Sequence, residues 1–175
     1  NSVLGVSWFW FVGTVLTGQL PTYGNVDLGG TASTYTILLA VFSVATGVGS
    51  MLCEKLSART VEIGLVPLGA FGMAVFLFVL ALWQPEPGAI YAHGMLHTIV
   101  SLSGIGLFAG FYVVPLFALI QSRTPKRELS RVIAAMNIQN AAFIVVAAVL
   151  GVAVLQFLHW TIPQLFLALA IVHAL

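Results

Sequence analysis

The sequence predicts an all-α integral membrane protein built from six transmembrane segments, and three observations carry that prediction. Of its 175 residues, 60 % are hydrophobic and 6 % are charged, whereas roughly a quarter of the residues in a soluble domain are charged. The mean hydropathy is +1.08. The apolar residues form stretches separated by turn signals, and most of these stretches approach the roughly 20 helical residues that cross a bilayer core.

The same composition excludes several classes of protein. Six Lys and Arg with five Asp and Glu cannot cover the surface of a water-soluble enzyme of this length, and they leave no basic patch of the kind that binds nucleic acid. The apolar content is too high for a disordered chain. A single cysteine, Cys53, excludes an internal disulfide and a cysteine-ligated metal cluster.

The first three spans are predicted at residues 2–20, 34–53 and 61–83. Pro21 and a polar, glycine-rich connection at 22–33 are expected to end the first. The second ends at a short charged loop, residues 54–60. The third ends at the breaker QPEPG, residues 84–88.

The other three spans are predicted at residues 95–121, 132–157 and 163–175. Pro115 is expected to kink or tighten the fourth helix. The most charged loop, residues 122–131, precedes the fifth. The sixth opens at Pro163 and reaches only Leu175, which is too short to cross the bilayer core. We therefore expect a truncated last helix in a fragment that begins at Asn1 and not at Met.

The basic residues predict the orientation of the bundle. All six fall in two loops, after the second and fourth spans, which lie on one side of the membrane if the spans are counted correctly. The other loops hold no Lys or Arg. The positive-inside rule then makes the two basic loops cytoplasmic. The residues are Lys55, Arg59, Arg123, Lys126, Arg127 and Arg131.

Small and polar residues recur at helical spacing within the spans, which puts them on shared helix faces. The first span carries Ser7, Trp10, Thr14 and Thr17, the second Thr36, Ala40, Ser43, Gly47 and Ser50, and the fourth Ser103, Gly106 and Gly110. In the fifth span Asn137 and Asn140 share a face, and Gln139 points elsewhere.

Each of these positions has a structural and a functional interpretation. Gly47, Gly106 and Gly110 are expected to be packing positions, because small residues let helices approach closely. The two asparagines either make interhelical hydrogen bonds or line a cavity. Trp10 either packs or lines a path for an amphipathic substrate. His173 is expected to be a structural histidine that faces the bundle.

The spans show no chemistry of catalysis or of cofactor binding. No Asp, Glu, Lys or Arg lies in the core of a predicted span, so a proton- or sodium-coupling carboxylate is not visible. The four histidines lack metal-ligand spacing. The sequence has no glycine-rich phosphate loop and no nucleophile elbow. We therefore expect no catalytic residue, no metal and no cofactor in this chain, and no nucleic-acid partner.

The loop after the second span resembles the signature loop of the major facilitator superfamily. It reads SMLCEKLSAR from Ser50 to Arg59. The family pattern has Gly, Leu, Asp, Arg and Gly at set spacings, followed by two basic residues. Here Ser50, Glu54, Lys55 and Ser57 replace four of these residues, and Arg59 is the one basic residue at the end. The family carries a weaker copy of this loop after its eighth helix, so the resemblance implies the C-terminal half, helices seven to twelve with the last truncated.

Three longer runs are similar to bacterial lysophospholipid transporters and to their acyltransferase-fused relatives. They are GFYVVPLFALIQ from Gly110 to Gln121, RVIAAMNIQN from Arg131 to Asn140, and GSMLCEKLS from Gly49 to Ser57 continuing into VEIGLVPLG from Val61 to Gly69. The chain departs from the stand-alone transporters near Asn140, where those have an acidic residue and this chain has only amides.

The resemblance implies a secondary transporter of the bacterial inner membrane that moves a lysophospholipid between leaflets by alternating access. Membrane lipid would be its surroundings and its substrate, and the missing N-terminal six-helix half would be its partner. The substrate path would be lined by Ser7, Trp10, Thr14, Thr17, Asn137 and Asn140. Glu54, Lys55 and Arg59 would form a cytoplasmic gate, since the acidic residue of this loop engages the other half in the family.

Two other functions stay open. One is a superfamily exporter of another small solute. The other is a membrane platform that holds a fused glycerophospholipid acyltransferase, whose chemistry would lie outside these residues. An acidic residue in the missing half would favour the first, and a downstream His-x-x-x-x-Asp motif would favour the second.

Overall fold

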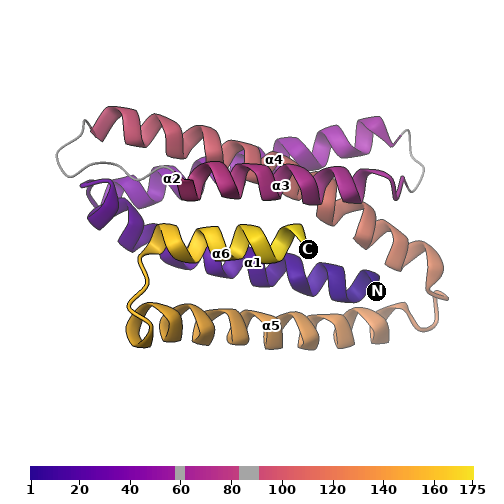
Figure 1. The fold of residues 1–175 in the computed structure, drawn as a ribbon. Coiled ribbons are helices and arrows are strands. Elements are labelled where there is room, and N and C mark those ends of the chain that lie inside the picture. The colour runs from indigo at the N-terminus through magenta and orange to yellow at the C-terminus, as the bar shows by residue number, and fades with distance from the viewer. Residues whose placement is uncertain (58–61, 83–90) are drawn as a thin grey trace.

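The computed structural model describes residues 1–57, 62–82 and 91–175, and they form a bundle of roughly aligned helices (Figure 1). In chain order the helices are α1 (Ser2–Thr22), the π-helix η1 (Tyr23–Asp27), α2 (Ala32–Leu56), α3 (Leu65–Leu82), α4 (Tyr91–Arg123), α5 (Leu129–Phe157) and α6 (Ile162–Ala174).

Five stretches in the described residues are long and apolar enough to cross a membrane. They are Ser2–Asp27, Ala32–Leu56, Leu65–Leu82, Gly94–Arg123 and Leu129–Phe157, and α6 is a shorter apolar helix. The chain is therefore a multi-pass, all-α membrane protein, as its composition predicted.

The prediction that Pro21 ends the first helix is wrong. Pro21 lies inside α1, and the helical path continues through η1 to Asp27. A proline removes one backbone donor, and membrane helices tolerate the loss where local π adjustments satisfy the neighbouring groups. Here the backbone N–H of Tyr23 reaches the carbonyls of Gln19 and Leu20, and that of Leu28 donates to the Tyr23 carbonyl at 3.0 Å. The connection predicted at residues 22–33 is correspondingly short.

Helices α2 and α6 begin at reciprocal caps. At the start of α2, the Thr34 hydroxyl accepts the Thr31 backbone N–H at 3.0 Å. At the start of α6, the Gln164 side chain accepts the Thr161 backbone N–H at 2.9 Å, and the Thr161 hydroxyl accepts that of Gln164 at 3.4 Å. Because a cap satisfies backbone donors that have no helical partner, these residues determine where each helix begins.

Helices α1 and α4 are the two centres of packing. Helix α4 packs against both α2 and α3, and α5 packs against α1. Helix α6 lies beside α3 and α1, and Figure 1 shows α5 along the far side of α1 from α2, α3 and α4. Helices that are distant in the sequence, such as α1 and α5, therefore lie side by side.

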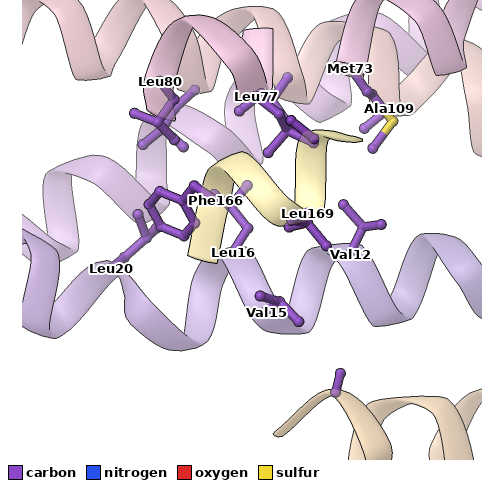
Figure 2. Close-up of a cluster of buried hydrophobic side chains, with 14 of the residues drawn as sticks. Val12, Val15, Leu16, Leu20, Met73, Leu77, Leu80, Ala109, Phe166 and Leu169 are labelled. Carbon is purple, nitrogen blue, oxygen red and sulfur yellow. The ribbon is translucent and has the colours of Figure 1, made fainter. Parts of the chain in front are cut away.

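The apolar core lies where α1, α3 and α6 meet (Figure 2). Leu16 and Leu20 of α1 are completely buried, as are Leu77 of α3 and Phe166 of α6. Lipid chains are as apolar as these side chains, so close packing rather than escape from water holds such helices together.

Glycines set the distance between α2 and α4. A Cβ at Gly49 would strike the backbone of Leu107, and a Cβ at Gly110 would strike the backbone of Ser50 and Gly49. At Gly106 it would lie 2.7 Å from the carbonyl oxygen of Phe42. The predicted packing roles of Gly106 and Gly110 are thus confirmed. The predicted packing role of Gly47 is wrong within the described helices, since none of their atoms lies within 4 Å of a Cβ built there.

The described basic residues lie at one end of the bundle. Lys55 is in the last turn of α2, and the charged loop between α4 and α5 is at the same end in Figure 1. The N-terminus of α1 is also at this end. The arrangement agrees with the expectation that the basic loops share one side of the membrane.

We predict that Gly49→Ala destabilises the bundle and that Gly47→Ala does not. The added methyl group meets the Leu107 backbone in the first variant and open space in the second. Overpacking of this kind costs about 1–3 kcal/mol. Thermal unfolding of the purified protein in detergent measures the difference, and equal melting temperatures for the two variants would contradict the close contact.

Candidate functional site

The polar stripe predicted on α1 is divided between the interior and the surface of the bundle. Ser7 is completely buried, whereas Trp10 is 41 % exposed. Thr14 and Thr17 are half-buried, and their hydroxyls donate to the carbonyls of Trp10 and Gly13, each at 2.7 Å. A threonine whose hydroxyl is satisfied by its own helix can face either lipid or a cavity.

The structure brings two of the predicted site residues together. The Ser7 hydroxyl donates to Oδ1 of Asn140 at 2.8 Å, and Asn140 is 6 % exposed. The same hydroxyl oxygen of Ser7 lies 3.1 Å from the carbonyl oxygen of Val3 in its own helix. The bond joins α1 to α5, so Asn140 makes an interhelical hydrogen bond, one of the two roles that the sequence left open.

Asn137 differs from Asn140 in its surroundings. Asn137 is exposed and Gln139 is half-buried. Helix α5 buries Met136, Asn140, Ala147 and Gly151, which form a single seam toward α1. Asn137 lies beside this seam and not in it. A polar side chain left on the surface of a membrane-spanning helix is available to a wet cavity or to another part of the protein.

The predicted gate residues lie partly in a helix. Glu54 and Lys55 are exposed residues in the last turns of α2, which extends beyond the predicted end of the second span at Cys53. Arg59 lies outside the described residues. The exposed carboxylate and ammonium groups are therefore at the C-terminal end of a membrane-spanning helix, at the end of the bundle that carries the charged loop between α4 and α5.

Sequence reasoning missed two hydrogen bonds that join helices distant in the sequence. The indole N–H of Trp8 donates to Nδ1 of His173 at 2.9 Å, which ties α1 to α6. The Tyr112 hydroxyl donates to the Gly5 carbonyl at 3.2 Å, which ties α4 to α1. The prediction that His173 is a bundle-facing histidine is confirmed, because it is 8 % exposed. Its partner could not be found from spacing, since 165 residues separate the two.

Two apolar grooves lie away from the predicted path. One, of about 690 Å³, lies between α2 and α4 and is lined by residues such as Val44 and Leu107. The other, of about 500 Å³, lies between α1, α5 and α6 and is lined by residues such as Phe11 and Val154. None of the predicted path residues lines either groove. Among the described residues there is also no group of three His, Cys, Asp or Glu side chains that could hold a metal.

We predict that Asn140→Ala lowers the stability of the bundle and that Asn137→Ala leaves it unchanged. The first removes the acceptor of the buried Ser7 bond, which is worth about 0.6–2 kcal/mol in a membrane. A double-mutant cycle of Ser7→Ala and Asn140→Ala, followed by thermal unfolding in detergent, isolates the coupling. Additive losses would contradict a direct bond between the two side chains.

The comparisons with known proteins agree with this architecture. A family model described as Major Facilitator Superfamily matches residues 3–175. Proteins named lysophospholipid transporter LplT are 32 % identical to the chain in Citrobacter koseri and in Shigella boydii serotype 4, and 31 % identical in Escherichia coli O1:K1.

Each of these similarities extends over 158 residues, which is 88 % of this chain and 37 % of the relative. The chain therefore spans little more than a third of the length of the relatives it matches. No solved structure matches it. Since the family model covers the chain from residue 3 to residue 175, the chain belongs to the Major Facilitator Superfamily.

Proposed function

We propose that this chain is the C-terminal half of a secondary transporter that moves lysophospholipid across the bacterial inner membrane. The three relatives reported above are named for that substrate. Transporters of this superfamily move two bundles against each other around a site near the middle of the membrane. The described helices supply one bundle, and an N-terminal six-helix half would supply the other.

The observation that carries the proposal is that α1 and α5 each leave a predicted path residue exposed. Ser7 and Asn140 join the two helices inside the bundle, whereas Trp10 and Asn137 lie on the surface. An exposed amide is unfavourable against hydrocarbon, so Asn137 faces a wet cavity or the other half in this proposal. Trp10 offers an apolar ring with one polar N–H, which suits an amphipathic substrate.

Helix α2 supplies a second open face. Its predicted stripe includes Thr36, Ala40, Ser43 and Gly47, and each of these residues is exposed. The hydroxyl of Ser43 is satisfied by the Leu39 carbonyl of its own helix at 2.8 Å. Small residues whose hydroxyl groups bind carbonyls of their own helix form a smooth surface. Such a surface lets a second bundle slide past during alternating access.

In this proposal the acidic end of α2 acts as a gate. Glu54 is exposed at the end of the bundle that carries the basic loops. A contact between Glu54 and the other half in one conformation alone would bias the balance between the inward- and outward-open states.

We predict that Asn137→Leu lowers transport in the full-length protein more than Gln139→Leu does. Two residues along a helix are about 200° apart around it, so the two variants test different faces. An amide contact in the membrane is worth about 0.6–1.7 kcal/mol, which corresponds to roughly a threefold to twentyfold loss. The loss is measured as the uptake of labelled lysophosphatidylethanolamine by spheroplasts that contain equal amounts of inserted protein.

Equal activity of the two variants would contradict a path along the Asn137 face. If the parent protein takes up no lysophosphatidylethanolamine, the proposal that lysophospholipid is the substrate is contradicted. The exporter of another solute and the acyltransferase platform would then be the functions to test. The stability of both variants is measured alongside, so that a folding defect is not read as a loss of transport.

We predict that Glu54→Gln shifts the conformational balance without reducing the amount of folded protein. The carboxylate is exposed, and exposed ion pairs contribute about 1 kcal/mol or less to stability. Spin labels placed across the cytoplasmic mouth of the full-length protein measure the populations. Lys126→Gln, which changes an exposed charge of the loop between α4 and α5 outside the proposed gate, is the matched control. An unchanged distance distribution for Glu54→Gln would make Glu54 an ordinary surface charge.

A further inference from the structure

The imidazole of His173 is the one buried titratable ring in the described part of α6, and the proposed transport path does not use it. Its Nδ1 accepts the indole N–H of Trp8 at 2.9 Å. The two rings are nearly parallel, with an interplanar angle of 9° and centroids 6.4 Å apart. This geometry presents the edge of one ring to the edge of the other, as a ring-to-ring hydrogen bond requires.

The hydrogen bond determines which nitrogen of His173 carries the proton. An indole N–H is only a donor, so Nδ1 must keep its lone pair and the proton of the neutral ring must be on Nε2. Nε2 is buried and has no hydrogen-bond partner among the described residues, and α6 packs against both α1 and α3. The neutral ring therefore lies between α1 and α3.

A second proton on this ring cannot be accommodated without movement. It would bind at Nδ1, and an N–H would then face the indole N–H of Trp8. Two donors that face each other make no hydrogen bond, and a buried donor without a partner is costly. The positive charge would also lie in an apolar bundle, where charge is expensive.

The groups around the ring offer no compensation. Tyr112 of α4 presents its ring at 64° to the imidazole, with centroids 6.0 Å apart, and its hydroxyl already donates to the Gly5 carbonyl at 3.2 Å. The charged residues of the neighbouring elements lie at helix ends: Glu62 precedes α3, Arg123 ends α4 and Arg131 is in the first turn of α5. In the described residues no carboxylate forms an ion pair with His173.

We propose that Trp8 and His173 form a proton-sensitive latch that holds α6 against α1 while the imidazole is neutral and releases it when the imidazole is protonated. The inference does not depend on the transported substrate, because it concerns the contact between two helices of this chain.

The experiment follows the bond and the helix separately in the full-length protein in lipid nanodiscs. Tryptophan labelled with ¹⁵N reports the Trp8 indole N–H, which is assigned with Trp8→Phe. Spin labels at Leu4 and Val172, both exposed, report the distance between the first turn of α1 and the part of α6 that contains His173. Spectra are compared at about pH 8 and about pH 5, on either side of the ordinary histidine pKa of about 6.5.

In the parent, acidification is expected to move the Trp8 resonance away from its hydrogen-bonded position and to broaden the distance distribution. His173→Gln should abolish both responses and keep the closed distance, because a Gln oxygen accepts the indole N–H and takes up no proton. His159→Asn is the matched control, since His159 is an exposed histidine at a positive φ of 53° that Asn tolerates. It should respond as the parent does.

Two results would overturn the proposal. One is a parent whose spectra are the same at both pH values. The other is a pH response that persists in His173→Gln, which would assign the response to another group. If His173→Gln does not fold, Trp8→Phe decides the question. It lacks the indole donor, so acid breaks no bond and the distance distribution should change less with pH than that of the parent. A response equal to that of the parent would rule the latch out.

Discussion

The constraint on which this bundle depends is that a polar group inside a bilayer must find its partner within the protein. Water is absent there, so a buried hydroxyl, amide or ring nitrogen is costly unless it binds another protein group or faces a cavity. The chain meets this requirement in two ways. Thr14 and Thr17 donate to carbonyls of their own helix, whereas Ser7 and Trp8 bind side chains of α5 and α6.

These hydrogen bonds and the close glycine contacts hold different parts of the bundle. Gly49 and Gly110 bring the backbones of α2 and α4 together, so that pair is held by packing over its length. Helix α5 buries only a narrow seam, and its bond through Asn140 to Ser7 provides a directional contact. The helices joined by polar contacts are therefore the ones whose separation a change in protonation or in a partner can alter.

The candidate path and the latch use different sides of α1. Trp8 and Trp10 are two residues apart, which puts their side chains about 200° apart around the helix. One binds His173 inside the bundle, and the other is 41 % exposed. Loss of the Trp8 hydrogen bond on the buried side can move α1 as a whole and so displace Trp10 on the exposed side, because α1 contacts α4, α5 and α6.

Composition and periodicity were sufficient for the class of protein and for most of its helices, because the bilayer imposes long apolar spans. The orientation, which rests on the basic residues of two loops, stays a prediction. Composition and periodicity also identified Gly106, Gly110 and a buried His173, whose roles follow from residue type. Tertiary structure alone showed that Gly49 rather than Gly47 meets α4, that Asn140 binds Ser7, and that Trp8 binds His173. Helical spacing says which residues share a face, but the neighbour of that face depends on how helices distant in the sequence pack.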